Sequence, residues 1–212
     1  MKTVIIICEG ETEEEFCKTL FSQYLQGVCR IEVRLLGGNC NWERIKNFVE
    51  KALKEQKTAV VTTFFDYYGV KTKNFPNWEE TLKFNKANVR DRIDLLEEGM
   101  LGAVDNNLSY RFIPYIQMHE FEAFLFNNIE VFDANFIQKE FNRTELLNLL
   151  NSFPDPEMIN QGTETSPSHR LIKILPSYNK IVYGNILAEM IGIDNICQKN
   201  KHFNDWIEKL RK

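Results

Sequence analysis

Apolar residues in the N-terminal part of the chain follow two alternating patterns. Continuous runs rich in β-branched residues at 4–8, 31–36 and 58–65 predict three strands. Between them, apolar residues recur at helical spacing over 12–25 and 42–53, which predicts two amphipathic helices. Strand and helix therefore alternate, as is typical of an α/β protein with a mainly parallel sheet flanked by helices.

Weaker signals mark the next elements. Thr12 and Glu15 have the spacing of a capping box, which predicts a helix start. A helix is expected over 88–98, a fourth strand over 110–117 and a short helix over 119–126.

The pattern changes from about residue 133. Helical periods at 136–150, 168–175, 181–191 and 203–210 are separated by Pro and Gly, and no run predicts a strand. We therefore expect an α/β core at 1–132 and a helical C-terminal extension at 133–212. The extension should pack on the core, because its apolar side chains are too many to leave in water.

Composition narrows the possible classes of protein. The chain has 212 residues, 43% of them hydrophobic, and a formal charge of −4, which excludes global disorder and a histone-like basic coat. Its five cysteines are odd in number and lack C-x-x-C spacing, so neither a disulfide framework nor a zinc ribbon is expected. No run approaches the roughly 18 apolar residues that span a bilayer. We expect a cytoplasmic protein that does not bind membranes.

Carboxylates follow three of the predicted strands. Glu9 ends the first strand, Asp66 ends the third, and Glu120 and Glu122 come after the fourth. Open parallel sheets bind ligands beyond the carboxyl ends of their strands, and clustered carboxylates suit Mg²⁺ or Mn²⁺. Such ions stabilise charge in phosphoryl transfer. The structural alternatives are a turn at Asp66 and a helix start at Glu120 and Glu122.

Two segments resemble the catalytic motifs of TOPRIM domains. Glu9-Gly10-Glu11-Thr12-Glu13-Glu14-Glu15-Phe16 is similar to the opening motif, in the version of the overcoming-lysogenization-defect nucleases, and Phe65-Asp66-Tyr67-Tyr68-Gly69 resembles the later aspartate motif. The resemblance implies a TOPRIM-like (Rossmann-like) fold and Mg²⁺-dependent cleavage, with Glu9 as general acid/base, Asp66 as metal ligand and Glu13 as a second ligand. The usual Asp-x-Asp is here Asp66-Tyr67-Tyr68. Either Glu120 or Glu122 replaces the missing carboxylate, or the site is weakened or lost.

Three further segments resemble a family of small TOPRIM-like bacterial proteins that are labelled as domains of unknown function and are often encoded beside ATPases. The segments are 117–124, 166–170 and 202–206. This resemblance implies a neighbouring ATPase as a partner and, by analogy of gene neighbourhood alone, a role in phage defence.

Basic residues gather after Asp66. Residues 70–92 hold six Lys or Arg against three acidic residues, with Phe75, Trp78 and Phe84 interleaved. Basic and aromatic residues together suit a phosphate backbone with stackable bases, although a solvated helix with packing aromatics is the alternative. The candidate nucleic-acid-binding residues are Lys71, Lys73, Arg90, His169, Arg170 and Lys180.

Three hypotheses about function remain. The first is a Mg²⁺- or Mn²⁺-dependent nuclease acting on DNA or RNA, which the basic residues favour. The second is an accessory module that works through a partner ATPase, which the missing aspartate favours. The third, a phosphatase or phosphotransferase for a small substrate, is disfavoured because no phosphate-binding loop is visible.

Overall fold

The computed structural model describes residues 1–70, 74–85, 88–160 and 162–212. Two of the candidate nucleic-acid-binding residues, Lys71 and Lys73, lie outside this range. The chain forms two compact units, residues 1–118 with 206–212 and residues 119–205. The first unit thus ends before the expected boundary at residue 132, and it includes the last residues of the chain.

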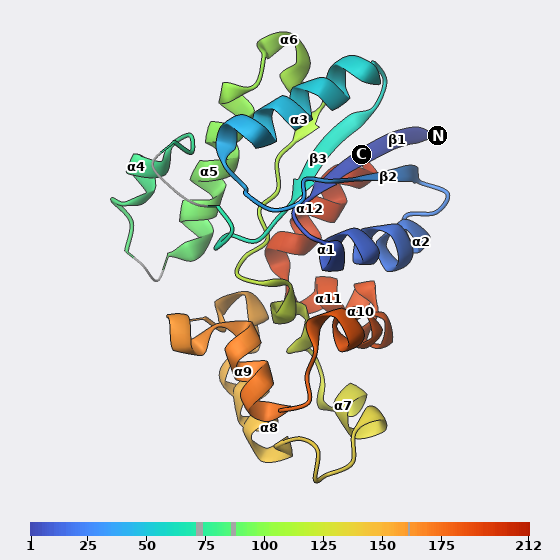
Figure 1. The fold of residues 1–212 in the computed structure, drawn as a ribbon, viewed down its shortest axis with the longest axis vertical. Helices are drawn as coiled ribbons and strands as arrows, with labels where there is room; N and C mark the ends of the chain where they lie inside the picture. Colours follow the sequence, from blue (N-terminus) through green and yellow to red (C-terminus); the bar gives the residue numbers. More distant parts are fainter. Residues whose placement is uncertain (71–73, 86–87, 161) are drawn as a thin grey trace. The chain divides into compact units, whose positions relative to one another are not determined.

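The first unit is built on a four-stranded parallel sheet (Figure 1). Its strands are β1 (Lys2–Cys8), β2 (Cys29–Leu35), β3 (Val60–Phe64) and β4 (Phe112–Ile113), in the order β2-β1-β3-β4. The α/β prediction is therefore confirmed. The chain moves from β1 outward to β2, then crosses back to β3 on the other side of β1. The gap between the ends of β1 and β3 is the topological switch point, where such sheets bind ligands.

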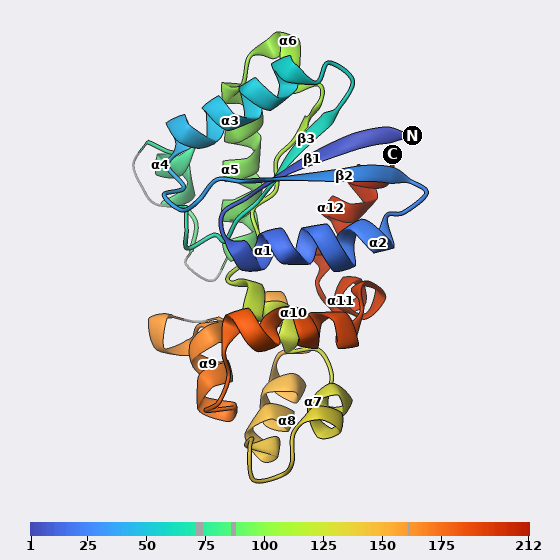
Figure 2. The same ribbon diagram turned by 45° about the vertical axis from the view of Figure 1, so that its right-hand side comes forward.

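Helices cover both faces of this sheet (Figure 2). Ile5 and Ile7 of β1 are fully buried in a core with Ile45, Val49 and Ile93, contributed by two long helices. Since successive strand residues point to opposite faces, Val4 and Ile6 are buried on the other side. The helices of this unit are α1 (Glu11–Phe16), the π-helical turn η1 (Cys17–Phe21), α2 (Ser22–Tyr24), α3 (Trp42–Glu55), α4 (Trp78–Thr81), α5 (Val89–Ala103) and α6 (Asn106–Ser109).

The second face of the sheet is closed by the end of α12 (Lys201–Arg211). The indole ring of Trp206 stacks on Tyr115 with 4.3 Å between ring centroids, and on Phe21 with 5.0 Å. Phe64 of β3 lies 5.6 Å from the same ring. The C-terminal residues are therefore part of the core of the first unit.

The fourth strand is shorter than predicted. Only Phe112 and Ile113 pair with β3, followed by a single bridge between Asp66 and Gln117. Pro114 has no backbone N–H to donate. The next two backbone N–H groups bond to side chains instead: that of Tyr115 donates to Thr63 Oγ1 and that of Ile116 to Glu97 Oε1. The ladder is interrupted because side chains take its hydrogen bonds.

The first helix also starts differently from the prediction. α1 begins at Glu11, and its N-cap is Gly10, which offers no side-chain hydrogen bond. Thr12 lies inside the helix rather than capping it. The predicted capping box is wrong, because the helix starts before Thr12 reaches the N-cap position.

In the part of the second unit that the structure describes, every regular element is a helix, and loops join them. Its core is rich in Phe; Phe124 lies 4.7 Å from Phe203 between ring centroids, and Phe132 lies 5.9 Å from Phe141. The region predicted to be helical from 136 becomes a helix only at Arg143. Its elements are η2 (Phe121–Leu125), α7 (Ile129–Asn135), α8 (Arg143–Ser152), η3 (Pro156–Met158), η4 (Thr163–Thr165), α9 (Pro167–Ile174), α10 (Lys180–Ile191), α11 (Ile193–Lys199) and the start of α12.

Across the described residues of both units, no helix combines the length and the apolar character needed to cross a membrane.

Candidate functional site

Glu9 is fixed by the strands on both sides of β1. Its backbone N–H donates to the carbonyl of Phe64 on β3 over 3.3 Å. Its own carbonyl accepts from the N–H groups of Gly37 and Gly38, at 3.2 and 3.1 Å, in the loop after β2. Both glycines have positive φ (75° and 76°), which lets two successive N–H groups reach one carbonyl. The first residue beyond β1 is thus held rigidly at the switch point.

Asp66 lies at the end of the neighbouring strand. Its backbone pairs with Gln117, and its carbonyl accepts from the N–H groups of Gly69 and Val70 at 2.9 and 3.3 Å. These bonds close a tight turn over 66–70. The predicted placement of Glu9 and Asp66 at the carboxyl ends of adjacent parallel strands therefore agrees with the geometry of the chain.

The turn brings Gly69 against the Glu9 carboxylate. A Cβ on Gly69 would overlap Glu9 Oε2 and would stand 3.1 Å from Glu9 Cδ. The space that a side chain would fill is occupied by the carboxylate. Gly69 is therefore required by a close approach between two segments, and not by a positive φ in the turn.

Cys40 is part of this site, and nothing in the sequence singled it out. The residue is 3% exposed and lies in the loop between β2 and α3. Burial raises the pKa of its thiol; the Glu9 carboxylate raises it further, by its charge and by accepting a hydrogen bond from the thiol. The charge of Asp66 acts in the same direction, and Arg44 acts against it. Cys40 is thus a protonated donor to Glu9, within electrostatic reach of both carboxylates.

Arg44 organises the loop that contacts Glu9. Its guanidinium donates to the carbonyls of Leu36 and Gly38, and its backbone N–H is capped by Asn41 Oδ1 at 3.0 Å. One side chain at the start of α3 thus ties down the residues whose N–H groups hold Glu9. Arg44 was not predicted, because its role depends on the loop conformation.

Glu13, the predicted second ligand, turns back over the start of its own helix. It is 5% exposed, and its Oε2 lies 2.9 Å from where a Cβ on Gly10 would stand. Among the described residues of the first unit, no three His, Cys, Asp or Glu ligand atoms lie within 4.8 Å of one another. Glu9, Glu13 and Asp66 therefore do not form a ready three-ligand cluster.

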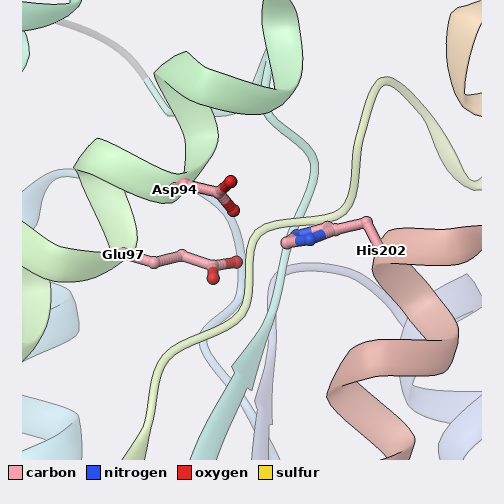
Figure 3. A group of neighbouring side chains, drawn as sticks. All are labelled: Asp94, Glu97 and His202. Carbon is pink, nitrogen blue, oxygen red and sulfur yellow. The ribbon is translucent and has the colours of Figure 1, made fainter.

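A second pair of acidic side chains in this unit lies on α5. Asp94 and Glu97 project from the same side of the helix (Figure 3). Glu97 is 6% exposed and accepts from the Ile116 N–H at 2.9 Å, while Asp94 pairs with Arg90 at 3.0 Å. Both have structural partners. Figure 3 also draws His202, which belongs to the second unit.

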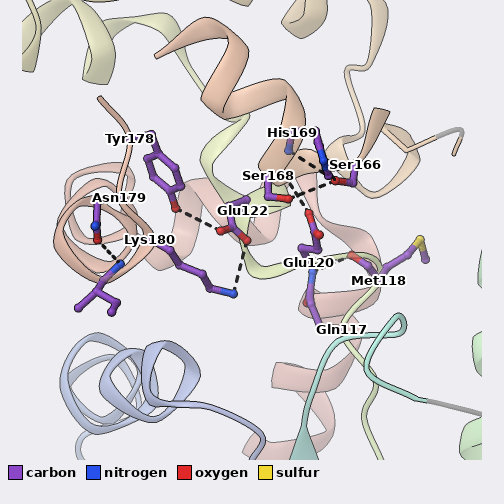
Figure 4. Close-up of polar contacts among 11 residues, drawn as sticks. Gln117, Met118, Glu120, Glu122, Ser166, Ser168, His169, Tyr178, Asn179 and Lys180 are labelled. Atoms are coloured by element: carbon purple, nitrogen blue, oxygen red, sulfur yellow. Dashed lines mark hydrogen bonds and ion pairs between the residues drawn. The ribbon is translucent and has the colours of Figure 1, made fainter. Parts of the chain in front are cut away.

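Glu120 and Glu122 both lie in the second unit (Figure 4). Glu120 Oε2 accepts from the Ser168 N–H at 2.8 Å, at the start of α9. Glu122 is 2% exposed; its carboxylate accepts from the Tyr178 hydroxyl at 3.4 Å and lies 3.6 Å from Lys180 Nζ. Each predicted ligand thus has protein partners of its own.

The candidate nucleic-acid-binding residues that the structure describes also have protein partners. Arg90 pairs with Asp94, and Lys180 pairs with Glu122. Arg170 donates to the Thr165 carbonyl at 2.9 Å and lies 5.2 Å from the centre of the Phe153 ring. His169 Nδ1 lies 2.8 Å from Ser166 Oγ, the N-cap of α9. These bonds supply a structural role for every member of the set within the described ranges.

The three segments that resemble the family of unknown function contribute to helix starts and to packing. In the 117–124 segment, Glu120 binds the start of α9, which the 166–170 segment forms. The 202–206 segment begins α12, where the buried Glu157 accepts from the N–H groups of His202 and Phe203 at 2.8 and 3.1 Å. Their common function is to join distant parts of the chain.

Comparison with known proteins identifies a family. The model of a family described as "Domain of unknown function (DUF4276)" matches residues 8–211, so the chain belongs to this family. Neither the curated proteins nor the solved structures contain a significant match.

Proposed function

We propose that this chain is a divalent-metal-dependent nuclease of the TOPRIM type, which hydrolyses phosphodiester bonds of DNA or RNA. Glu9 is the general acid/base, and Asp66 is a ligand of Mg²⁺ or Mn²⁺. The observation that carries the proposal is the position of the two carboxylates. They follow adjacent parallel strands and flank the switch point of the sheet.

The donor set fits a hard cation. Mg²⁺ is commonly held by one or two carboxylates together with waters and substrate phosphate oxygens, so Asp66 suffices as the ligand from the protein. The third nearby group, Cys40, is a neutral thiol whose pKa is raised, and so it does not offer the thiolate that soft metals prefer. When bound, the ion neutralises charge that develops on the phosphoryl group.

Glu9 suits the proton-transfer role because its backbone cannot shift. Phe64 of β3 holds it on one side and the loop after β2 on the other, and Gly69 leaves room for its carboxylate. Its carboxylate accepts a proton from the attacking water or returns one to the leaving oxygen, while the Cys40 thiol orients it by donating a hydrogen bond.

The second candidate is an accessory module that acts through a partner ATPase. Two observations favour it. Tyr68 takes the place of the second aspartate of the TOPRIM pattern. In addition, no three ligand atoms of the described first unit are clustered. On this alternative, the shape of the site is retained and its turnover is lost.

The test compares three variants of the purified chain. Single- and double-stranded DNA and RNA are incubated with Mg²⁺ or Mn²⁺, with and without the neighbouring ATPase. Glu9→Gln keeps size and polarity and should abolish cleavage with metal affinity largely retained. Asp66→Asn should weaken Mn²⁺ binding, so that excess Mn²⁺ partly restores cleavage. Glu11→Gln, an exposed glutamate of the same acidic run, is the control and should cleave like the parent chain.

Two outcomes would contradict the nuclease. Cleavage that survives both Glu9→Gln and EDTA would exclude this mechanism. No cleavage under any condition, together with tight binding of the ATPase, would establish the accessory module instead.

A further inference from the structure

The turn that begins at Asp66 and brings Gly69 against the Glu9 carboxylate also carries an exposed aromatic ring. Tyr68 is 47% exposed, whereas Tyr67 before it is 9% exposed. The two residues that flank this pair are the ones that define the site. Asp66 precedes it, and Gly69, which contacts the Glu9 carboxylate, follows it.

The Tyr68 ring is held in position by the buried tyrosine that precedes it. Tyr67 belongs to the core that α3 and α5 form with the sheet, and its ring meets that of Tyr68 edge-on, with 5.5 Å between centroids and an angle of 63°. The backbone of the turn is closed by the bonds from Gly69 and Val70 to the Asp66 carbonyl. An anchored ring with an accessible surface is a platform and not a loose surface side chain.

We propose that Tyr68 is a stacking platform for an unpaired base, and that the substrate is single-stranded nucleic acid. This inference rests on the proposed nuclease function and specifies its substrate. A base next to the cleaved phosphodiester stacks on the ring while the phosphate reaches Glu9 and Asp66. Every base has an apolar π-face, so such stacking is largely independent of sequence.

The same geometry disfavours an intact duplex. In a duplex, each base is already stacked on its neighbours and is paired, so its face is available to a protein ring only after the base is unstacked. An exposed ring on the turn that follows Asp66 therefore selects strands whose bases are already free. Single-stranded DNA and single-stranded RNA share this property, and separate arms of the test distinguish them.

The fold supplies a matched control. Tyr110 is 77% exposed and immediately precedes Arg111 and β4, so it lies at the amino end of a strand of the same sheet. Its ring lies 5.5 Å from the Arg111 guanidinium carbon. Tyr110 is thus an exposed tyrosine of the same unit, at the opposite edge of the sheet from the carboxylates.

The test measures binding by fluorescence anisotropy in Ca²⁺ or EDTA, with labelled oligothymidylate or oligouridylate of about 16 nucleotides and a duplex of equal length. Tyr68→Ala should weaken binding of the single strand by about tenfold, Tyr68→Phe should stay within about twofold, and Tyr110→Ala should change nothing. In the cleavage assay, Tyr68→Ala should raise KM with little change in kcat, because stacking is retained from ground state to transition state.

Each alternative result is decisive for one of the two proposals. The stacking platform would be overturned if Tyr68→Ala and Tyr110→Ala lost equal affinity for the single strand, or if duplex and single strand bound equally well. Cleavage by Tyr68→Ala with an unchanged KM would overturn it too. Binding that depends on Tyr68 without any cleavage would retain the platform and exclude the nuclease. Cleavage that does not depend on Tyr68 would retain the nuclease and exclude the platform.

Discussion

The indole N–H of Trp206 donates a hydrogen bond of 2.8 Å to Oγ1 of Thr62, a residue of the central strand β3 that lies 144 positions earlier in the chain. Thr62 in turn donates to the carbonyl of Ile113 on β4. A single polar chain thus links the C-terminal helix with two strands inside an aromatic cluster.

Trp206 should be a major determinant of the stability of the first unit. Trp206→Ala removes a fully packed ring and should lower the free energy of unfolding by about 3–5 kcal/mol. Trp206→Phe keeps most of the stacking and loses the hydrogen bond, so it should cost about 1–2 kcal/mol. Urea unfolding followed by circular dichroism measures both. If both variants lost the same free energy of unfolding, packing of the ring would contribute little to stability.

Gly69→Ala should damage the site and spare the fold. The new methyl group would overlap the Glu9 carboxylate, which must then rotate away. Because that carboxylate is the proposed general acid/base, we expect the rate of Mg²⁺-dependent cleavage of an oligonucleotide to fall by about tenfold, a change of about 1.4 kcal/mol in activation free energy.

Gly102→Ala is the control for that substitution. No atom lies within 4 Å of the added Cβ, and the residue lies in α5, so this change should stabilise the chain by about 0.5–1 kcal/mol. If both alanine variants cleave at the rate of the parent chain, the contact between Gly69 and Glu9 has no bearing on catalysis.

His119 should make the protein sensitive to acid. Burial lowers the pKa of its ring to about 4 from the usual 6.5, against the opposing effects of a hydrogen bond to the Glu157 backbone and of the Glu120 charge. The folded-state pKa is depressed, so the stabilising contribution is complete above about pH 6.5 and is lost as the pH falls towards 4. Over that range, the free energy of unfolding should decrease by about 3 kcal/mol through this residue.

His119→Asn tests the origin of that loss. The residue has a φ of 67°, which asparagine tolerates better than most residues, so the backbone should be retained. The variant should be less stable at pH 7 and should lose less stability between pH 6.5 and 4.5. Urea titrations at several pH values decide the matter; a slope identical to that of the parent would assign the acid sensitivity to other groups.

Lys180 should stabilise the folded chain by pairing with the buried Glu122 carboxylate. Lys180→Met keeps the aliphatic stem but leaves a carboxylate that is 2% exposed without its cation, and should cost about 1–3 kcal/mol. Adding Glu122→Gln should recover part of that loss. Lys173→Met, at an exposed position of α9, should change stability little. No loss in Lys180→Met, combined with loss of Mn²⁺ binding in Glu122→Gln, would instead favour Glu122 as a metal ligand.

The sequence predicted the elements whose signals are local. The apolar runs of β1 and β3 are buried because they lie inside the sheet, and the carboxylates that follow them lie at its edge by the geometry of parallel strands. The strand predicted over 110–117 is longer than β4. The backbone N–H groups of two of its residues donate instead to the side chains of Thr63 and Glu97, which are distant in sequence.

The unpredicted parts of the site depend on contacts between distant segments. Cys40 and Arg44 carry no motif, and their relation to Glu9 exists only once the loop after β2 is folded. Likewise, the role of Trp206 could not be predicted from α12, because an apolar helix face does not indicate which part of the chain it packs against. Periodicity reports which side of an element is buried and not which segment covers it.

The division of the chain has a consequence for its synthesis. Residues 119–205 are made between the two parts of the first unit, so a ribosome releases the whole second unit before Trp206 leaves the exit tunnel. Until then, Phe21, Phe64 and Tyr115 lack the ring that stacks on them. The first part of the protein to be translated is therefore the last to be completed, and aromatic surface that is left open during that interval is prone to aggregation.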